Sequence, residues 1–431
     1  MPVKAAFFVP HPPLIIPAVG RGKENEISKT VSSYRKIALQ IKKIAPDTIV
    51  FITPHCAMYS DYFHISPGTR ARGSFARFNA AGSVYEAEYD TGFIHDIVGL
   101  AKKNNINAGT DGERDAALDH GTMIPIHFIN EVYSGYKSVR ISISGLGFNE
   151  HFKLGELIGK AAGEKNIVII ASGDLSHKLT KDGPYGFAKE GPEFDKKIAE
   201  IIEAGDLGKL SELPEDLCEN AAECGLRCLI IAAGALGSSY RSILLSYEGP
   251  FGVGYLCASF FTEDPYVNLA RRTLEGYVKN KKTPPAPDGL PDEMLSERAG
   301  VFVSIKKFGD LRGCIGTIMP ATENIASEII MNAVSSGARD PRFYPVTENE
   351  LNDLQYSVDV LMPPEPINSF TELDVLKYGV IVSTAYKRGL LLPNLDGVET
   401  VQEQVGIALK KAGIEPGVKC KMERFEVVRH K

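Results

Sequence analysis

Near its amino end the chain reads Ala5-Ala6-Phe7-Phe8-Val9-Pro10-His11-Pro12-Pro13, an apolar run that proline and histidine close abruptly. Proline lacks the N–H group that a central strand donates, so the stretch predicts a buried strand that ends at the prolines. The same pattern returns at Thr48–Thr53, which precedes His55, and at Ile167–Ser172, which precedes His177. In open α/β sheets, ligands bind outside the carboxyl ends of the strands. The three histidines therefore predict one convergent site.

Strand-like apolar runs alternate with helix-like segments through the first part of the chain. The further strands are expected at Val139–Ser144 and Ser242–Ser246, and the helices at Ile27–Lys43, His95–Asn104, Lys153–Gly163, Glu193–Glu203 and Cys224–Leu236. Such alternation predicts an α/β domain in which helices flank a mixed sheet.

The pattern breaks after Phe260-Phe261-Thr262-Glu263-Asp264-Pro265. The next segment, Tyr266–Val278, has an apolar helical face that must pack on its own domain, whereas residues 279–291 are rich in proline and charge. We therefore expect domains at residues 1–262 and 265–431, and a linker at residues 279–291 is the alternative. The second domain, a smaller α+β fold, is expected to combine strands at Gly300–Lys306 and Tyr378–Ser383 with helices at Glu323–Val334 and Val401–Lys411.

Composition excludes several classes of protein. Of 431 residues, 44% are hydrophobic, which is ordinary for a folded chain. The 48 basic and 54 acidic side chains leave a net charge of −6, which predicts no nucleic-acid or anionic-lipid partner. No apolar run approaches the roughly 18 residues of a membrane span. The seven cysteines form no regular framework, which predicts reduced thiols in the cytoplasm. We expect a small-molecule substrate, and a homo-oligomer is an open alternative.

Neutral imidazole is the commonest protein metal ligand, so His11 and His55 predict a metal site that needs a third ligand. Glu223 and Cys224 both lie at the start of the expected apolar helix that ends at Leu236. Glu223 would complete a set of two histidines and a carboxylate suited to ferrous iron, although a carboxylate there also suits a helix start. Cys224, with a thiol pKa lowered by the helix, would favour zinc or copper, with iron still open. The residues alone leave both choices open.

Four short motifs carry a resemblance to a known family: Val9-Pro10-His11-Pro12-Pro13, Thr53-Pro54-His55, Leu118-Asp119-His120-Gly121 and Ser172-Gly173-Asp174-Leu175-Ser176-His177. Over about residues 1–262 the chain resembles the LigB-type class III extradiol dioxygenases. The resemblance implies that His11, His55 and Glu223 hold Fe(II). It also implies that His177 acts as acid and base and that His120 handles substrate or dioxygen. The expected reaction is oxidative cleavage of a catechol-like or other small planar substrate.

Cys224-Gly225 and the apolar segment to Leu236 also resemble the MEMO family, a branch of the same fold that is not a dioxygenase. That resemblance makes Cys224 the third ligand and argues against ordinary ring cleavage. The alternative function is therefore a metal-dependent enzyme without oxygen chemistry. A metal-binding scaffold without turnover is a further alternative.

The second half resembles the AMMECR family over residues 265–431. The motifs are Leu311-Arg312-Gly313-Cys314-Ile315-Gly316-Thr317, Asp340-Pro341-Arg342-Phe343 and Gly389-Leu390-Leu391-Leu392-Pro393. The resemblance implies a two-part α+β fold with a substrate or partner cleft near Arg312, Cys314, Thr317 and Arg342. Arg312 suits a carboxylate or phosphate, although a tight turn with a buried cysteine explains the motif equally well. The two families in one chain resemble the AMMECR–MEMO–radical-SAM grouping, which implies a separate radical-SAM partner.

Overall fold

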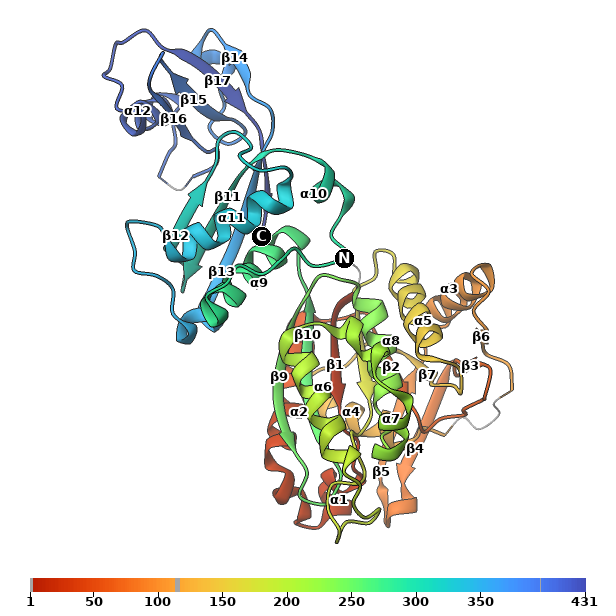
Figure 1. Ribbon diagram of the computed structural model, residues 1–431. Coiled ribbons are helices and arrows are strands. Elements are labelled where there is room, and N and C mark those ends of the chain that lie inside the picture. The colour runs from red at the N-terminus through yellow and green to blue at the C-terminus, as the bar shows by residue number, and fades with distance from the viewer. Residues whose placement is uncertain (1–2, 113–116, 396) are drawn as a thin grey trace. The chain divides into compact units, whose positions relative to one another are not determined.

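The computed structural model describes residues 3–112, 117–395 and 397–431, which form two compact units (Figure 1). Unit 1 ends at Thr262 and unit 2 begins at Glu263. Among the helices of the described residues, none combines the length and the apolar content that crossing a bilayer requires.

Unit 1 is built around a mixed sheet with the strand order β7-β2-β8-β1-β10-β9. The strands are β1 (Val3–Val9), β2 (Thr48–Thr53), β7 (Lys137–Ser142), β8 (Ile167–Ser172), β9 (Tyr240–Glu248) and β10 (Tyr255–Thr262). β7, β2, β8 and β1 run parallel, and β10 and β9 complete the sheet antiparallel. Every residue of β2 and β8 is buried, which explains why both strands appear in the sequence as uninterrupted apolar runs.

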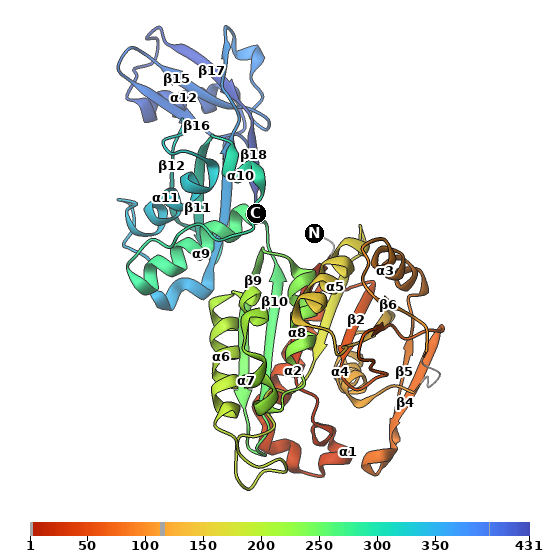
Figure 2. The same ribbon diagram turned by 45° about the vertical axis from the view of Figure 1, so that its right-hand side comes forward.

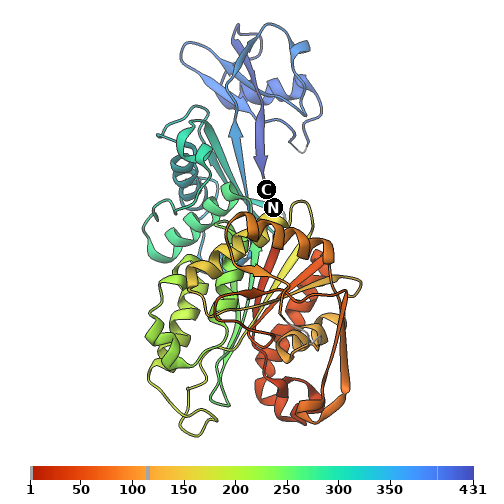
Figure 3. The same cartoon turned by 90° about the vertical axis from the view of Figure 1, so that its right-hand side faces the viewer.

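Helices cover both faces of this sheet, and Figure 3 shows the two layers on opposite sides of the strands. One layer contains α2 (Ser28–Ile44) and α4 (His120–Asn130). The other contains α5 (Phe148–Ala161) and α8 (Leu226–Leu236), which pack closely against each other. The remaining helices of unit 1 are α1 (Pro17–Gly20), α3 (Thr91–Lys103), α6 (Glu190–Ala204) and α7 (Glu215–Ala221), with 3-10 turns η1 (Pro13–Ile15), η2 (Lys23–Ile27), η3 (Ala76–Phe78) and η4 (Leu207–Glu212).

Short strands extend unit 1 beyond the main sheet. They are β3 (Phe63–His64), which pairs with β6 (Ala108–Gly109), and β4 (Arg70–Phe75), which pairs with β5 (Ala80–Glu88). β4, η3 and β5 form a hairpin that Figure 2 shows as a long arm beside the sheet. The hairpin contacts α4, so it lies next to the chain that carries His120.

Unit 2 is smaller and is α+β, with two antiparallel sheets among its described residues. Their strand orders are β12-β11-β13-β18 and β14-β17-β15-β16. The strands are β11 (Gly300–Lys307), β12 (Asp310–Gly316), β13 (Leu354–Leu361), β14 (Glu365–Ile367), β15 (Gly379–Ser383), β16 (Arg388–Leu391), β17 (Lys421–Phe425) and β18 (Val427–His430). The helices are α9 (Pro265–Asn280), α10 (Asp292–Ser296), α11 (Ile325–Ala338) and α12 (Val401–Ala412), with 3-10 turns η5 (Glu348–Asp353) and η6 (Phe370–Glu372).

The apolar face expected on the first helix of unit 2 packs inside that unit. α9 and α11 cover one face of the first sheet, and Leu269, Leu274 and Val278 of α9 lie in its hydrophobic core. The second sheet packs on α12. The predicted fold class, an α/β domain followed by a smaller α+β domain, is thus confirmed.

Candidate metal centre

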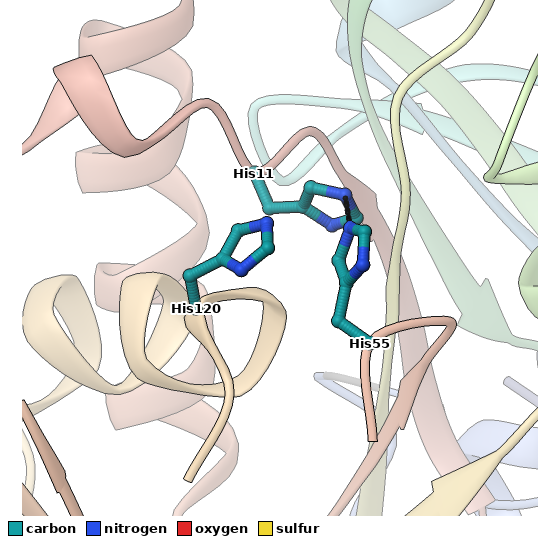
Figure 4. Close-up of side chains that lie close together, drawn as sticks. All are labelled: His11, His55 and His120. Atoms are coloured by element: carbon teal, nitrogen blue, oxygen red, sulfur yellow. Dashed lines mark hydrogen bonds between the residues drawn. The ribbon is translucent and has the colours of Figure 1, made fainter. Parts of the chain in front are cut away.

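Two loops at the carboxyl edge of the sheet bring His11 and His55 together, and the start of α4 adds His120 (Figure 4). His11 follows β1 and His55 follows β2, and both strands neighbour β8. The Nε2 atoms of His11 and His55 are 2.9 Å apart. The ring centre of His120 lies 4.1 Å from that of His55 and 5.2 Å from that of His11. His11 and His55, two of the three histidines that follow parallel strands, therefore converge.

Hydrogen bonds fix the orientation of His11, which is 2% exposed. Its Nδ1 lies 3.0 Å from Ser172 Oγ, and this hydroxyl donates to the carbonyl of Gly121 at 2.7 Å. A hydroxyl has one proton, so Ser172 Oγ must accept from Nδ1–H of His11. His11 Nε2 therefore carries the lone pair, and it faces His55. Sequence reasoning missed this role of Ser172, whose only signal is a hydroxyl at the end of an apolar strand.

The loop before α4 is tied to the end of β2. Asp119 is the N-cap of α4, and it accepts hydrogen bonds from Thr122 N at 3.0 Å and from Thr53 Oγ1 at 2.8 Å. Buried Arg140 lies 3.5 Å from the same carboxylate. A Cβ at Gly121 would stand 2.5 Å from Thr53 Oγ1, so only glycine lets the first turn of α4 approach this closely. These contacts bring His120 beside His55.

Cys224, one of the two candidates for the third metal ligand, lies beside His11. Its Sγ lies 3.5 Å from His11 Nε2 and accepts a hydrogen bond from the backbone N–H of Asp174 at 3.2 Å. Asp174 also accepts from the backbone N–H of His11 at 2.8 Å. The loop after β8 thus holds both the sulfur and the imidazole in place.

Glu223 points elsewhere. Its carboxylate accepts from Leu226 N at 2.6 Å, which is the helix-start role that the sequence also allowed. Because α8 begins at Leu226, Cys224 lies in the turn before the helix. The expectation of a lowered Cys224 pKa was wrong, because burial, followed by the charge of Asp174, raises the pKa of this thiol well above its ordinary value.

The arrangement fits a metal ion. Metal–nitrogen bonds of about 2.0–2.1 Å and metal–sulfur bonds of about 2.3 Å place nitrogen and sulfur ligands about 3.5 Å apart at a tetrahedral angle. Cys224 Sγ and His11 Nε2 have this separation. The potential ligand atoms of His11, Asp174 and Cys224 all lie within 4.8 Å of one another, as do those of His11, His55 and His120. A metal ion bound here would displace the thiol proton.

The histidines are held neutral, the form in which imidazole binds metals. Burial lowers the pKa of His11 well below its ordinary value, and the neighbouring His55 lowers it further. Burial also lowers the pKa of His120 to about 4 and lowers that of His55. At neutral pH the cluster therefore presents lone pairs.

His177 lies beside the cluster, with its side chain 19% exposed. Its Nδ1 donates to the carbonyl of Ala222, and its Nε2 lies 3.8 Å from Asp174 Oδ2. Burial raises the pKa of Asp174 to about 6. The Asp174 carboxylate therefore lies between two histidines: one oxygen accepts from the backbone N–H of His11, and the other is 3.8 Å from His177 Nε2.

A pocket of about 670 Å³ opens beside the cluster, between the β4–β5 hairpin and the start of α4. We call it the hairpin pocket. His55 and His120 line its inner end, and Phe78 stands edge-on to the His120 ring at 5.5 Å between centres. The other lining residues are Arg72, Gly73, Ser74, Ala76, Arg77, Ala81, Val84, Ala117, Leu118, Asp119 and Met123.

In unit 2, Cys314 and Arg342 meet around one carboxylate. Asp340 accepts from Arg342 Nε at 2.9 Å and from Cys314 N at 2.9 Å. Arg342 Nη2 also donates to the carbonyl of Cys314 at 2.9 Å, and Ser304 Oγ lies 3.3 Å from the sulfur. The Arg342 side chain holds the pKa of Asp340 at about 2.

The other two candidates of unit 2 bind different carboxylates. Arg312 donates to both oxygens of Glu350, at 3.0 and 3.1 Å, and thereby lowers the pKa of Glu350 to about 2. Thr317 Oγ1 donates to Glu328, which is fully buried. Arg312 and Thr317 thus serve separate internal contacts.

Known proteins match both units. Residues 5–258 match the family model of the catalytic LigB subunit of aromatic ring-opening dioxygenase, and residues 267–430 match the AMMECR1 model. A protein of Clostridium acetobutylicum is 41% identical over 467 aligned positions, which cover both chains completely. A protein of Thermotoga maritima is 48% identical over 171 positions, 39% of this chain and 98% of its own. An uncharacterized protein of Pyrococcus horikoshii has a crystal structure with 32% identity and a TM-score of 0.36, covering 38% of this chain and 88% of that one.

Proposed function

The chain belongs to the LigB family through unit 1 and carries an AMMECR1 domain in unit 2, and on that basis we propose that unit 1 is a metal-dependent enzyme in which His11, His55 and Cys224 hold one divalent metal. The observation that carries this proposal is the position of His11, the residue common to both groups of potential ligands: its Nε2 lies 3.5 Å from Cys224 Sγ and 2.9 Å from His55 Nε2. Glu223, the carboxylate of the other ligand set, instead bonds to Leu226 N.

The surroundings of the sulfur support a thiolate ligand. The N–H of Asp174 points at Cys224 Sγ, and such hydrogen bonds stabilise negative charge on sulfur. Two imidazoles and a thiolate form a soft set suited to zinc or copper, and ferrous iron also accepts it. A thiolate in place of the carboxylate argues against ordinary ring cleavage, so the proposed reaction does not require dioxygen.

A bound metal would polarise a substrate oxygen and favour its deprotonation. The protein supplies the path for that proton. His177 Nε2 can take it, because Nδ1 is already held as a donor by Ala222 and Asp174 Oδ2 lies 3.8 Å from Nε2. His120 positions substrate from the other side, where its ring lines the hairpin pocket beside Phe78. The substrate class is a small planar molecule with a phenol-like hydroxyl.

A ring-cleaving dioxygenase that uses Fe(II) on a catechol-like substrate is the second candidate. It is favoured by the hairpin pocket, which opens on His55 and His120 and has room for a catechol beside the cluster. We also propose a separate radical-SAM protein as a partner of the first candidate, on the strength of the two families that meet in this chain.

Metal analysis of anaerobically purified protein tests the proposal. The wild type is compared with Cys224→Ala, Glu223→Ala and the control Cys228→Ala, which removes a buried thiol one helical turn further along. We expect near-stoichiometric metal that only Cys224→Ala removes, and no oxygen uptake with catechols. Metal lost only in Glu223→Ala, together with oxygen uptake, would establish the dioxygenase instead. Metal retained in every variant would refute both ligand sets.

A further inference from the structure

We propose that unit 1 contains a second ligand site, which binds a small zwitterion with an apolar body, such as an α-amino acid with an aliphatic side chain. The site is a pocket of about 420 Å³ between α2 and α4, which we call the helix pocket. Small-molecule sites typically have volumes of roughly 300–1,000 Å³. The residues that line the helix pocket include none of the candidate metal ligands, so this inference is independent of the proposed function.

The lining combines apolar and charged side chains. Ile15, Val31 and Phe128 supply apolar surface and come from η1, α2 and α4. Phe128 is buried, and its ring stacks on that of Tyr34 with 4.5 Å between the ring centres. This stacking fixes one wall of the pocket. An aliphatic group of a ligand would be buried against these side chains, which is favourable.

The helix pocket also carries charges of both signs. Arg35 is exposed on the side of α2 that lines the pocket, and Glu131 lines it from the carboxyl end of α4. Within residues 3–112, 117–395 and 397–431, Arg35 forms no ion pair with a carboxylate. Opposite charges that share a pocket without pairing suit a ligand that itself carries both charges.

His127 does not neutralise Glu131. Its Nε2 lies 3.7 Å from Glu131 Oε1, and its Nδ1 lies 3.0 Å from Tyr85 Oη. Because Nε2 faces a carboxylate, it carries the ring proton, and Nδ1 accepts from the Tyr85 hydroxyl. Burial lowers the pKa of His127, so the imidazole is uncharged at neutral pH. The negative charge of Glu131 therefore remains available to a cation.

The balance of charge in the lining favours a zwitterion over a simple anion. Glu24, the other carboxylate of the lining, accepts from the backbone N–H of Gly22 at 2.8 Å and adds a second negative charge. Glu131 is also the C-cap of α4, and the carbonyl end of a helix favours a positive group. An ammonium group therefore belongs beside Glu131. The planar guanidinium of Arg35 suits a carboxylate.

The test uses L-leucine and two analogues that each lack one of its charges. 4-Methylpentanoate lacks the ammonium group, and 3-methylbutylamine lacks the carboxylate. Binding is measured by anaerobic calorimetry with the full-length chain, both metal-loaded and after treatment with a chelator. Because charge-assisted contacts are strong, we expect leucine to bind about tenfold more tightly than either analogue, and equally well with and without metal.

Each variant removes one of the two charges. We expect Arg35→Gln to bind leucine and 3-methylbutylamine equally, because the carboxylate no longer contributes. Glu131→Gln should bind leucine and 4-methylpentanoate equally, because the ammonium group no longer contributes. The controls are Lys36→Gln and Glu26→Gln, which remove exposed charges of α2 and η2 that do not line the pocket, and they should retain both preferences.

Three results would overturn the inference. The first is equal binding of the three probes by the wild type, or preferences that survive both Arg35→Gln and Glu131→Gln. The second is binding of leucine to the metal-loaded protein alone, because the amino acid would then coordinate the metal cluster instead. The third is no binding of leucine in either state.

Discussion

The metal cluster of unit 1 and the Arg-Gly-Cys motif of unit 2 use polar side chains in opposite ways. In unit 1, Ser172 satisfies Nδ1 of His11 and leaves Nε2 directed at His55 and Cys224. In unit 2, Arg312 is paired with Glu350 and Arg342 with Asp340. The side chains of the metal cluster keep lone pairs available to a ligand, whereas most polar groups of the unit 2 motif form hydrogen bonds with one another. A motif rich in chemical groups can therefore be largely structural, and only the partners of each atom reveal the difference.

The largest effect that this comparison predicts is from His11→Ala. We expect the metal content of the purified protein to fall to background, because His11 belongs to both groups of potential ligands. The thermal unfolding of the protein should change little by comparison. Metal analysis beside the control His95→Ala, an exposed histidine on α3, checks this. Metal retained at wild-type levels would show that the cluster is not a ligand site.

For Glu328→Ala in unit 2 we expect a loss of stability with no change in metal content. Fully buried Glu328 accepts hydrogen bonds from Ala321 N, Thr322 N and Thr322 Oγ1 in addition to Thr317. Removing it leaves buried donors unsatisfied, which costs about 3 kcal/mol or more of unfolding free energy. Urea unfolding beside exposed Glu323→Ala measures this. A fall in metal content as well would show that the metal site of unit 1 depends on the buried contacts of unit 2.

Ser172→Ala sharpens the comparison within unit 1. Without the hydroxyl, His11 is free to adopt the other tautomer, so we expect metal affinity to fall roughly ten- to a hundredfold. Ser142→Ala is the matched control, because Ser142 is also a buried serine that ends a strand of the same sheet. Equal metal affinities measured by competition with a chelator would contradict the assigned tautomer.

An effect on pH dependence alone is expected from Asp195, a buried carboxyl group of unit 1 whose hydrogen bonds are satisfied inside the unit, as those of Asp340 and Glu350 are in unit 2. Buried Asp195 accepts from Ser176 N at 2.8 Å and from Tyr247 Oη at 2.7 Å, and burial raises its pKa to about 7. The folded state therefore holds this proton more tightly than the unfolded state. Stability should fall as the pH rises from about 4, the ordinary pKa of an aspartate, to about 7, by up to about 1.4 kcal/mol per pH unit, and then level off.

Asp195→Asn should remove this part of the pH dependence, because an amide does not titrate. Unfolding measured at several pH values, beside exposed Glu200→Gln on the same helix, provides the check. Identical pH profiles for Asp195→Asn and the wild type would show that Asp195 titrates normally.

Local pattern determined the fold class and the position of the first two histidines. β1 and β2 are buried on both faces and are therefore visible as apolar runs, and both run parallel. Residues directly after parallel strands lie at the same edge, so the convergence of His11 and His55 follows from strand assignment alone. His120 follows no strand of the sheet, and only the family resemblance indicated it.

The third ligand could not be chosen from the sequence. Glu223 and Cys224 are adjacent, and their roles depend on where α8 begins. Because α8 begins at Leu226, the carboxylate of Glu223 accepts from the first N–H of the helix, and Cys224 is left facing His11. A shift of the helix start by one or two residues lies within the uncertainty of any sequence pattern.

The sequence by itself thus determined the resemblance to two families, the division into two domains with their main strands and helices, and a histidine site at the carboxyl edge of parallel strands. Only the tertiary structure decided which atoms face that site and which are already satisfied. Ser172 and Gly121 lie 161 and 110 residues from His11, and Glu350 lies 38 residues from Arg312. Local periodicity contains no information about such contacts, because hydrogen-bond partners are selected by packing between distant segments rather than by neighbours along the chain.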